Sequence, residues 1–145
     1  MDRGDPSGAP RIQTVIATPS GVVHLDASFL IRGLALGSPE ALRLDRWNEQ
    51  GRVLAMSTLA WGQFLCGPLG TGDDALAERI VSTHVPIGLD EAREAARLFN
   101  ETGRRRSSFP DCLIAAAAIL ASAPLATTDH GDFERFREFG LDLAG

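Results

Sequence analysis

The chain contains no lysine, so all fourteen of its basic residues are arginine. Its formal net charge is −5, which argues against the broad, sequence-independent coating of nucleic acid that needs a strongly basic face. Any reaction that depends on a lysine side chain is also excluded. A nuclease that carries acidic metal ligands and contacts phosphates through a few arginines is still allowed.

Long hydrophobic runs are missing too, because no segment approaches the roughly 18 uninterrupted apolar residues of a membrane span. The N-terminus has no apolar run behind a basic start, so we expect no signal peptide. Only two cysteines occur, Cys66 and Cys112, and they form no C-x-x-C pair, so we expect both to be core residues. Together these features predict a protein of the reducing cytoplasm.

The length of 145 residues, 44% of them apolar, suits one globular domain and is too short for two. Residues 1–20 are rich in Gly, Pro, Ser and Thr and lack helical periodicity. We therefore expect a loosely ordered N-terminal extension over residues 1–20 and a single domain over residues 21–145.

Short apolar runs alternate with helical patterns through that domain. Strands are expected at 22–26, 52–57, 84–87, 125–128 and 141–143. Helices are expected at 27–36, 39–50, 58–66, 73–83, 89–102, 109–122 and 133–139. Because the strand runs lack polar alternation, they are typical of a parallel sheet covered by helices on both faces, which is an α/β fold in three layers.

Three aspartates fall where the ends of the strands are expected to meet. Asp26 closes the first strand, Asp129 follows the fourth, and Asp111 lies at the start of the apolar helix before it. Ligand sites of open α/β sheets gather beyond the carboxyl ends of the strands. Crowded carboxylates resist ionisation unless a cation neutralises them, and oxygen ligands suit Mg²⁺ or Mn²⁺. Taken singly, each aspartate also fits an ordinary turn or helix cap.

Three segments resemble the motifs of the PIN domain family, especially the VapC-type toxins of bacterial toxin–antitoxin pairs. They are LDASFLI at 25–31, PDCLIAAAA at 110–118 and LATTDHGDF at 125–133. They occur in the family's order and extend the resemblance over roughly residues 22–143.

This resemblance implies a Rossmann-like domain with a short central parallel sheet that cleaves RNA with Mg²⁺ or Mn²⁺. Asp26, Asp111 and Asp129 would hold the metal, directly or through water. Ser28 and either Thr127 or Thr128 would contact metal-bound water or phosphate, although ordinary structural hydroxyls are the alternative. The implied partners are a cognate antitoxin and a second copy of the chain, and apolar positions between residues 27 and 44 are a candidate groove for either.

One position departs from the family pattern. The family usually carries a Glu six residues after a Ser on the helix that follows the second strand, and counting from Ser57 that position is Gln63. Gln is neutral and offers one carbonyl oxygen in place of a carboxylate. Three explanations stay open: a nuclease with weakened metal binding helped by Asp132, a pseudo-enzyme that binds RNA or a protein partner, or an engineered replacement.

Arginines and histidines complete the candidate residues. Arg104, Arg105 and Arg106 precede the helix that bears Asp111, so they are candidates for steering RNA phosphate, although such a run is also typical of a solvated loop. His24 and His84 are expected to be strand residues of no special role.

Two other classes of α/β protein fit poorly. A response-regulator receiver needs a lysine on its last strand, and this chain has none. A haloacid-dehalogenase-type phosphatase needs a second Asp two residues after the first, and position 28 is Ser.

Overall fold

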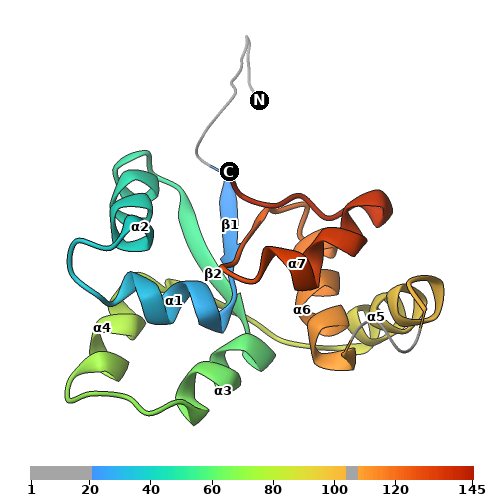
Figure 1. Cartoon of the computed structure of the whole chain (residues 1–145), viewed down its shortest axis with the longest axis horizontal. Helices are drawn as coiled ribbons and strands as arrows, with labels where there is room; N and C mark the ends of the chain where they lie inside the picture. Colours follow the sequence, from blue (N-terminus) through green and yellow to red (C-terminus); the bar gives the residue numbers. More distant parts are fainter. Residues whose placement is uncertain (1–20, 104–107) are drawn as a thin grey trace, which may run out of the picture.

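The computed structural model describes residues 21–103 and 108–145 (Figure 1). The predicted N-terminal extension at 1–20 lies outside the described residues. Arg104, Arg105 and Arg106 lie outside them as well, so their predicted contact with RNA stays a prediction.

The centre of the domain is a four-stranded sheet in the order β3-β2-β1-β4. All three strand pairs are parallel. The strands are β1 (Val22–Leu25), β2 (Val53–Ser57), β3 (Thr83–Val85) and β4 (Leu125–Ala126). Because β2 and β3 extend the sheet on one side of β1 and β4 pairs on the other, the strand order reverses at β1.

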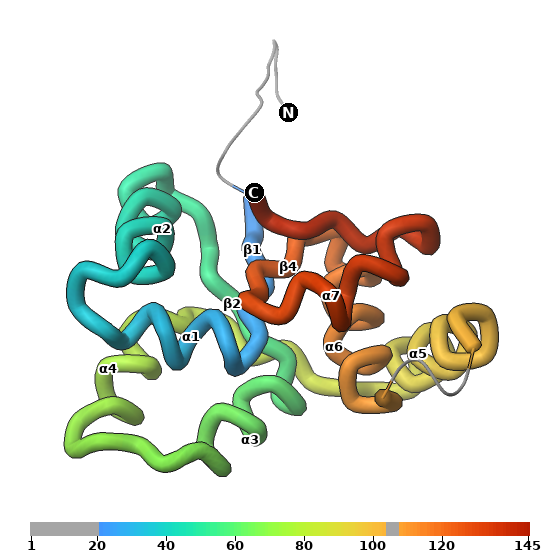
Figure 2. Tube along the Cα trace, in the orientation of Figure 1, coloured from blue at the N-terminus to red at the C-terminus, as the bar shows by residue number. Residues whose placement is uncertain are grey.

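Helices lie on both sides of this sheet (Figures 1 and 2), with α1 and α2 on one side and α6 and α7 on the other. The prediction of an α/β fold in three layers is confirmed. The helices are α1 (Ala27–Gly33), α2 (Pro39–Glu49), α3 (Thr58–Cys66), α4 (Asp73–Ile80), α5 (Leu89–Glu101), α6 (Phe109–Leu120), α7 (His130–Phe133) and the 3₁₀ helix η3 (Glu134–Phe139).

Serine caps begin three of these helices where the sequence changes from loop to helical pattern. The Ser38 hydroxyl accepts a hydrogen bond from Ala41 N at 3.0 Å, with Pro39 at the first helical position. Ser57 caps α3 in the same way, and Ser108 caps α6. The cap on α6 fixes the start of that helix and so sets the position of Asp111 in its first turn.

Several predicted element boundaries are wrong, and tertiary pairing explains the end of α4. The helix expected at 73–83 ends at Ile80, because Ser82 N already donates to Leu54 O of β2. The helix expected at 27–36 ends at Gly33, and turns follow it in which Ala35 N donates to Arg32 O and Ser38 N donates to Ala35 O. The last expected strand is reduced to one parallel bridge between Leu125 and Leu143.

The core is built from aromatic residues on the outer elements and alanines on α6. Phe29 and Trp47 stack with ring centroids 5.6 Å apart and join α1 to α2. Alanines 115–118 of α6 are all buried, and their small side chains let this helix pack closely against its neighbours. Within the described residues, no helix combines the length and hydrophobicity that crossing a membrane requires.

Candidate active site

The carboxyl ends of β1 and β4 meet where the strand order reverses, which is where ligands bind in open α/β sheets. Asp26 directly follows β1, and its backbone N–H donates to Ala126 O of β4 at 3.1 Å. Asp129 follows β4 after a two-residue connection and is the N-terminal cap residue of α7. The two aspartates are therefore placed at adjacent strand ends.

Asp26 is buried, with 4% of its surface exposed, and both of its carboxylate oxygens accept hydrogen bonds. Its Oδ1 accepts from Ser28 Oγ at 2.7 Å and from Phe29 N at 2.9 Å, so the side chain also caps α1. Its Oδ2 accepts from Thr127 Oγ1 at 2.5 Å. These donors fix the orientation of the carboxylate.

The same two hydroxyl groups connect the end of β1 to the end of β4. The Thr127 hydroxyl accepts from Asp129 N at 2.9 Å, and the Ser28 hydroxyl accepts from Thr128 N at 3.2 Å. Ser28 and Thr127 therefore orient Asp26, while Thr128 contributes its backbone N–H. Their predicted contact with phosphate or metal-bound water stays a prediction.

The electrostatics of the site link the aspartates to one another. Burial raises the pKa of Asp26, the donors from Thr127, Phe29 and Ser28 oppose that rise, and the negative charge of Asp129 adds to it. Burial also raises the pKa of the half-buried Asp111. Asp129 therefore lies within electrostatic reach of both Asp26 and Asp111.

The charges of Asp132 and Arg135 also act on Asp111. The charges of Asp132 and Asp129 raise the pKa of Asp111 further, while the Ser108 hydroxyl and the Arg135 guanidinium lower it. Sequence reasoning missed Arg135. The available signal was its spacing, since it lies three residues after Asp132 and six after Asp129.

A divalent cation fits this group of residues in chemistry and charge. Within residues 21–103 and 108–145, no three acidic, histidine or cysteine side chains are close enough to hold a metal ion as a direct ligand set. Mg²⁺ usually keeps several waters and takes one or two protein carboxylates. Burial is the main cause of the raised pKa values of Asp26 and Asp111, and the charge of Asp129 adds to both, which is a repulsion that a cation would relieve.

Gln63 lies on α3, the helix that follows β2, and its side chain is exposed. A neutral amide therefore stands on the helix that follows β2, the strand that neighbours β1. The part of the sheet edge beyond β2 thus lacks the negative charge that the family's usual glutamate would add.

His24 of β1 is the second feature that sequence reasoning missed. The side chain is 2% exposed, and its Nε2 has no hydrogen-bond partner among the described residues. Burial lowers the pKa of His24, so the ring is held neutral. His24 is therefore a strand residue, as expected, but its buried Nε2 lacks a hydrogen-bond partner among the described residues.

Comparison with known proteins supports the fold. The chain matches the PIN domain family over residues 23–138. No curated protein matches the sequence. Among solved structures, the VapBC2 complex from Rickettsia felis, bound to a promoter DNA fragment, has a TM-score of 0.69 at 14% identity, over 85% of this chain and 97% of that chain.

Two structures from Mycobacterium tuberculosis are also similar. VapC20, described as a toxin that cleaves the sarcin–ricin loop, has a TM-score of 0.61 at 17% identity, over 84% of this chain and 98% of that chain. VapBC-5 has a TM-score of 0.56 at 25% identity, over 87% of this chain and 100% of that chain. Since the family match at 23–138 runs from β1 into η3, and so includes both the sheet and its aspartate-bearing edge, the chain belongs to the PIN domain family.

Proposed function

We propose that this protein is a metal-dependent endoribonuclease that acts as the toxin of a VapBC-type toxin–antitoxin pair in the cytoplasm. The observation that carries the proposal is the oriented, buried Asp26 carboxylate at the strand-order reversal, within electrostatic reach of Asp129. The family assignment supports it, because PIN domains include nucleases. The fold of VapC20, a toxin described as cleaving an RNA loop, is similar.

In this mechanism, Asp26, Asp111 and Asp129 would hold Mg²⁺ or Mn²⁺, directly or through water. When bound, the ion would polarise the phosphodiester and activate a water molecule for in-line attack. Asp26 contributes a carboxylate whose orientation is set in advance by Ser28, Phe29 N and Thr127. Asp132, whose charge reaches Asp111, would add negative charge at the more exposed side of the site.

Gln63 supports a second candidate function. With a neutral side chain at this position, the site has one carboxylate fewer than the family pattern. Metal affinity decreases when the number of charged ligands decreases. The alternative is a catalytically weakened or inactive PIN module that acts by binding RNA or a protein partner. We favour a nuclease with weakened metal binding, because the other acidic positions are all retained.

A groove of about 390 Å³ between α1, α2 and α4 supports an antitoxin partner. Its lining is largely apolar, with polar groups from Asp45, Asn48 and Arg79. Leu36 lines the groove and is fully exposed, which leaves apolar surface for an apolar segment of an antitoxin to cover.

A homodimer is also part of the proposal. Exposed apolar side chains occur outside the groove on α3, α5 and α6, and they are Leu65, Leu89, Phe109 and Leu120. Covering them would remove apolar surface from water. Light scattering of the purified chain tests this point, and a monomer at micromolar concentration contradicts it.

The nuclease proposal is tested by incubating the purified chain with single-stranded and structured RNA in Mn²⁺, Mg²⁺ or a chelator. We expect cleavage that requires the metal and disappears in the Asp26→Ala variant. Cleavage that survives in Asp26→Ala would come from a contaminant. No cleavage with either ion, together with retained binding of RNA or of a protein partner, would establish the alternative.

A further inference from the structure

Arg43 of α2 joins two parts of the chain that both contribute to the site. Its guanidinium carbon lies 5.1 Å from the ring centroid of Phe29 and 4.9 Å from that of Trp47. Its Nη2 donates to the carbonyl oxygen of Ala144 at 3.0 Å and to that of Gly145 at 2.8 Å. Arg43 therefore holds the segment that follows η3 against α1 and α2.

The first connection runs from Arg43 through Phe29 to Asp26. The backbone N–H of Phe29 donates to Asp26 Oδ1 at 2.9 Å, and the Phe29 ring is completely buried. A cation over an aromatic ring is attracted by the negative charge of the ring face, so Arg43 stabilises this position of Phe29. Phe29 alone therefore links Arg43 to the Asp26 carboxylate.

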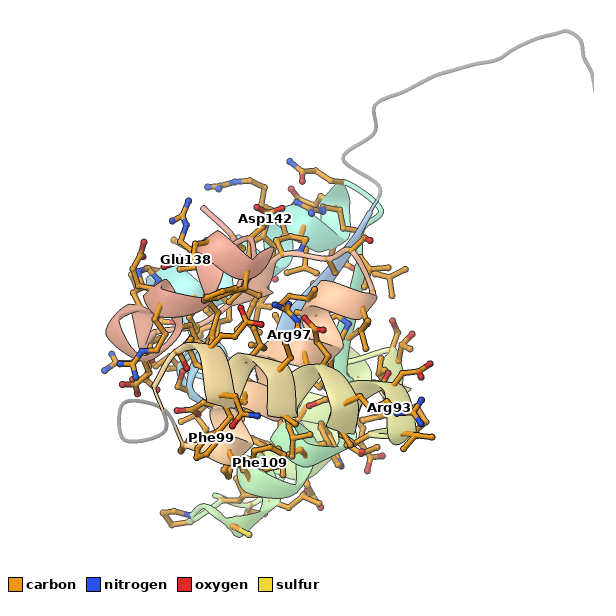
Figure 3. The ribbon with its side chains drawn as sticks, turned by 90° about the vertical axis from the view of Figure 1, so that its right-hand side faces the viewer. Arg93, Arg97, Phe99, Phe109, Glu138 and Asp142 are labelled. Atoms are coloured by element: carbon orange, nitrogen blue, oxygen red, sulfur yellow. The ribbon has the colours of Figure 1, made fainter. Side chains whose placement is uncertain are left out.

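The second connection runs through the segment that follows η3, and Figure 3 shows Asp142 on this segment. Leu125 N donates to Asp142 O at 2.8 Å, and Ala144 N donates to Leu125 O at 2.8 Å. This pairing adds the segment to the sheet beside the first residue of β4. Two residues after Leu125, the Thr127 hydroxyl donates to Asp26 Oδ2.

The two connections meet at Asp26 from different parts of the chain. Phe29 N donates to one carboxylate oxygen and Thr127 Oγ1 donates to the other, and Arg43 contacts elements on both paths. A guanidinium is suited to this task because its flat face can lie on the rings while its N–H groups donate at its edge. An ammonium group lacks that flat face.

We propose that Arg43 is a positioning residue of the site. By holding α1 and the segment paired with β4 together, it keeps Phe29 N and Thr127 Oγ1 aimed at the Asp26 carboxylate. Arg43 acts only through these neighbours. Its effect on cleavage rests on the proposed function, whereas its effect on Asp26 can be measured in a chain that performs no reaction.

Hydrogen exchange of single backbone amides tests the positioning in the full-length, metal-free chain. The reporter amides are Phe29 N–H, which donates to Asp26, and Asp129 N–H, which donates to the Thr127 hydroxyl. The internal control is Ala60 N–H, which donates to the serine cap of α3 at 3.1 Å and makes no contact with either path. Exchange is followed by NMR with a chelator present.

Arg43→Met keeps an unbranched stem over the rings and removes the charge and the donors. The matched control is Arg46→Met on the same helix, because the Arg46 side chain is exposed and makes no hydrogen bond or ion pair with the described part of the chain. We expect Arg43→Met to lower the protection of the Phe29 and Asp129 amides about tenfold, as for loss of a charge-assisted contact. The Ala60 amide should not change, and Arg46→Met should change none of the three.

Cleavage by the same variants tests whether the positioning serves the reaction. With saturating Mn²⁺, at a temperature where the variants are folded, Arg43→Met should lower kcat about tenfold, because a misplacement of about 1 Å can cost a hundredfold. The KM for RNA should not change. Arg43→Lys keeps the charge and should restore part of the protection and of kcat, and it serves as the test if Arg43→Met does not fold.

The outcomes separate this inference from the proposed function. Equal loss of protection at Phe29, Asp129 and Ala60 would show general loosening of the fold and would overturn the role of Arg43, as would no loss at all. Selective loss of protection with an unchanged kcat also overturns it and leaves the nuclease standing. Selective loss in a chain that cleaves no RNA with either metal supports the positioning of Asp26 and rejects the nuclease.

Discussion

The two parts of the sheet edge differ in charge and in order. Beyond β1 and β4, Asp26 is buried and held by three hydrogen-bond donors, and Asp129 lies within electrostatic reach of it. Beyond β2, the exposed Gln63 contributes no charge. The comparison teaches that negative charge at this edge is concentrated at the strand-order reversal. Metal affinity should therefore depend strongly on Asp26 and be open to improvement at position 63.

The largest expected effect is at the charged part. Asp26→Asn should lower RNA cleavage roughly a thousandfold, because several kcal/mol of metal-assisted stabilisation are lost. The same change should raise the free energy of unfolding of the metal-free protein at pH 7, since the pKa of Asp26 is raised and its ionised form is disfavoured by burial. Denaturation curves with a chelator, and a cleavage assay with Mn²⁺, measure the two effects.

The sign of the pH dependence gives a further check on Asp26→Asn. A carboxyl whose pKa is raised in the folded state binds protons more strongly there, so it favours the native state increasingly as pH falls through the folded pKa. The stability advantage of Asp26→Asn should therefore shrink from pH 7 toward acid. A stability advantage that is constant across this pH range would show that the pKa of Asp26 is not raised in the folded state.

The next effect concerns the uncharged part of the edge. Gln63→Glu should tighten Mn²⁺ binding about tenfold, or about 1.4 kcal/mol, and raise cleavage at limiting metal. Gln50→Glu, which adds the same charge at the exposed end of α2, is the matched control and should leave both quantities unchanged. Equal metal titrations for the chain and for Gln63→Glu would remove position 63 from the site.

A smaller effect is expected from the hydroxyl that orients Asp26. Thr127→Val removes the donor to Oδ2, which normally opposes the rise in the pKa of Asp26. The acid limb of the pH–rate profile should therefore move to higher pH, with a stability loss of about 1 kcal/mol. Thr128→Val is the control, because Thr128 contacts Ser28 through its backbone N–H. If both variants shift the profile equally, the hydroxyl of Thr127 has no specific role.

The smallest effect is expected in the core just before the site. His24→Leu replaces a buried ring whose Nε2 has no partner among the described residues, so it should raise the free energy of unfolding by about 1 kcal/mol at pH 8. His84→Leu, at an exposed position of β3, is the control and should not raise the free energy of unfolding.

The pH dependence of the His24→Leu effect has the opposite sign to that of Asp26. Burial lowers the pKa of His24 below 6.5, so the unfolded chain binds a proton on this ring more readily than the folded chain does. The native chain is therefore destabilised as pH falls through and below 6.5. The advantage of His24→Leu should therefore grow between pH 8 and pH 5.5, as measured by chemical denaturation. A constant advantage would mean that His24 is not forced to stay neutral.

Local signals in the sequence were sufficient for much of the fold. Side-chain chemistry over a few neighbouring residues predicts the apolar strand Val22–Leu25 and the serine cap at Ser38. It also predicts the helix Thr58–Cys66 with both of its bounds. The placement of Asp26 and Asp129 at strand ends is equally local. Boundaries set by distant partners were not predictable, as at Ser82, whose backbone N–H pairs with Leu54 O.

The sequence by itself therefore determined the succession of strands and helices, the acidic residues that end two of the strands, and the loss of charge at position 63. Only the tertiary structure decided that Thr127 and Ser28 turn their hydroxyls onto Asp26, that His24 is buried without a partner, and that Arg135 acts on Asp111. The physical reason is distance along the chain. Burial, hydrogen bonding and charge coupling depend on which remote segments meet, and Asp26 and Thr127, which are 101 positions apart, make their contact without any local signal for it.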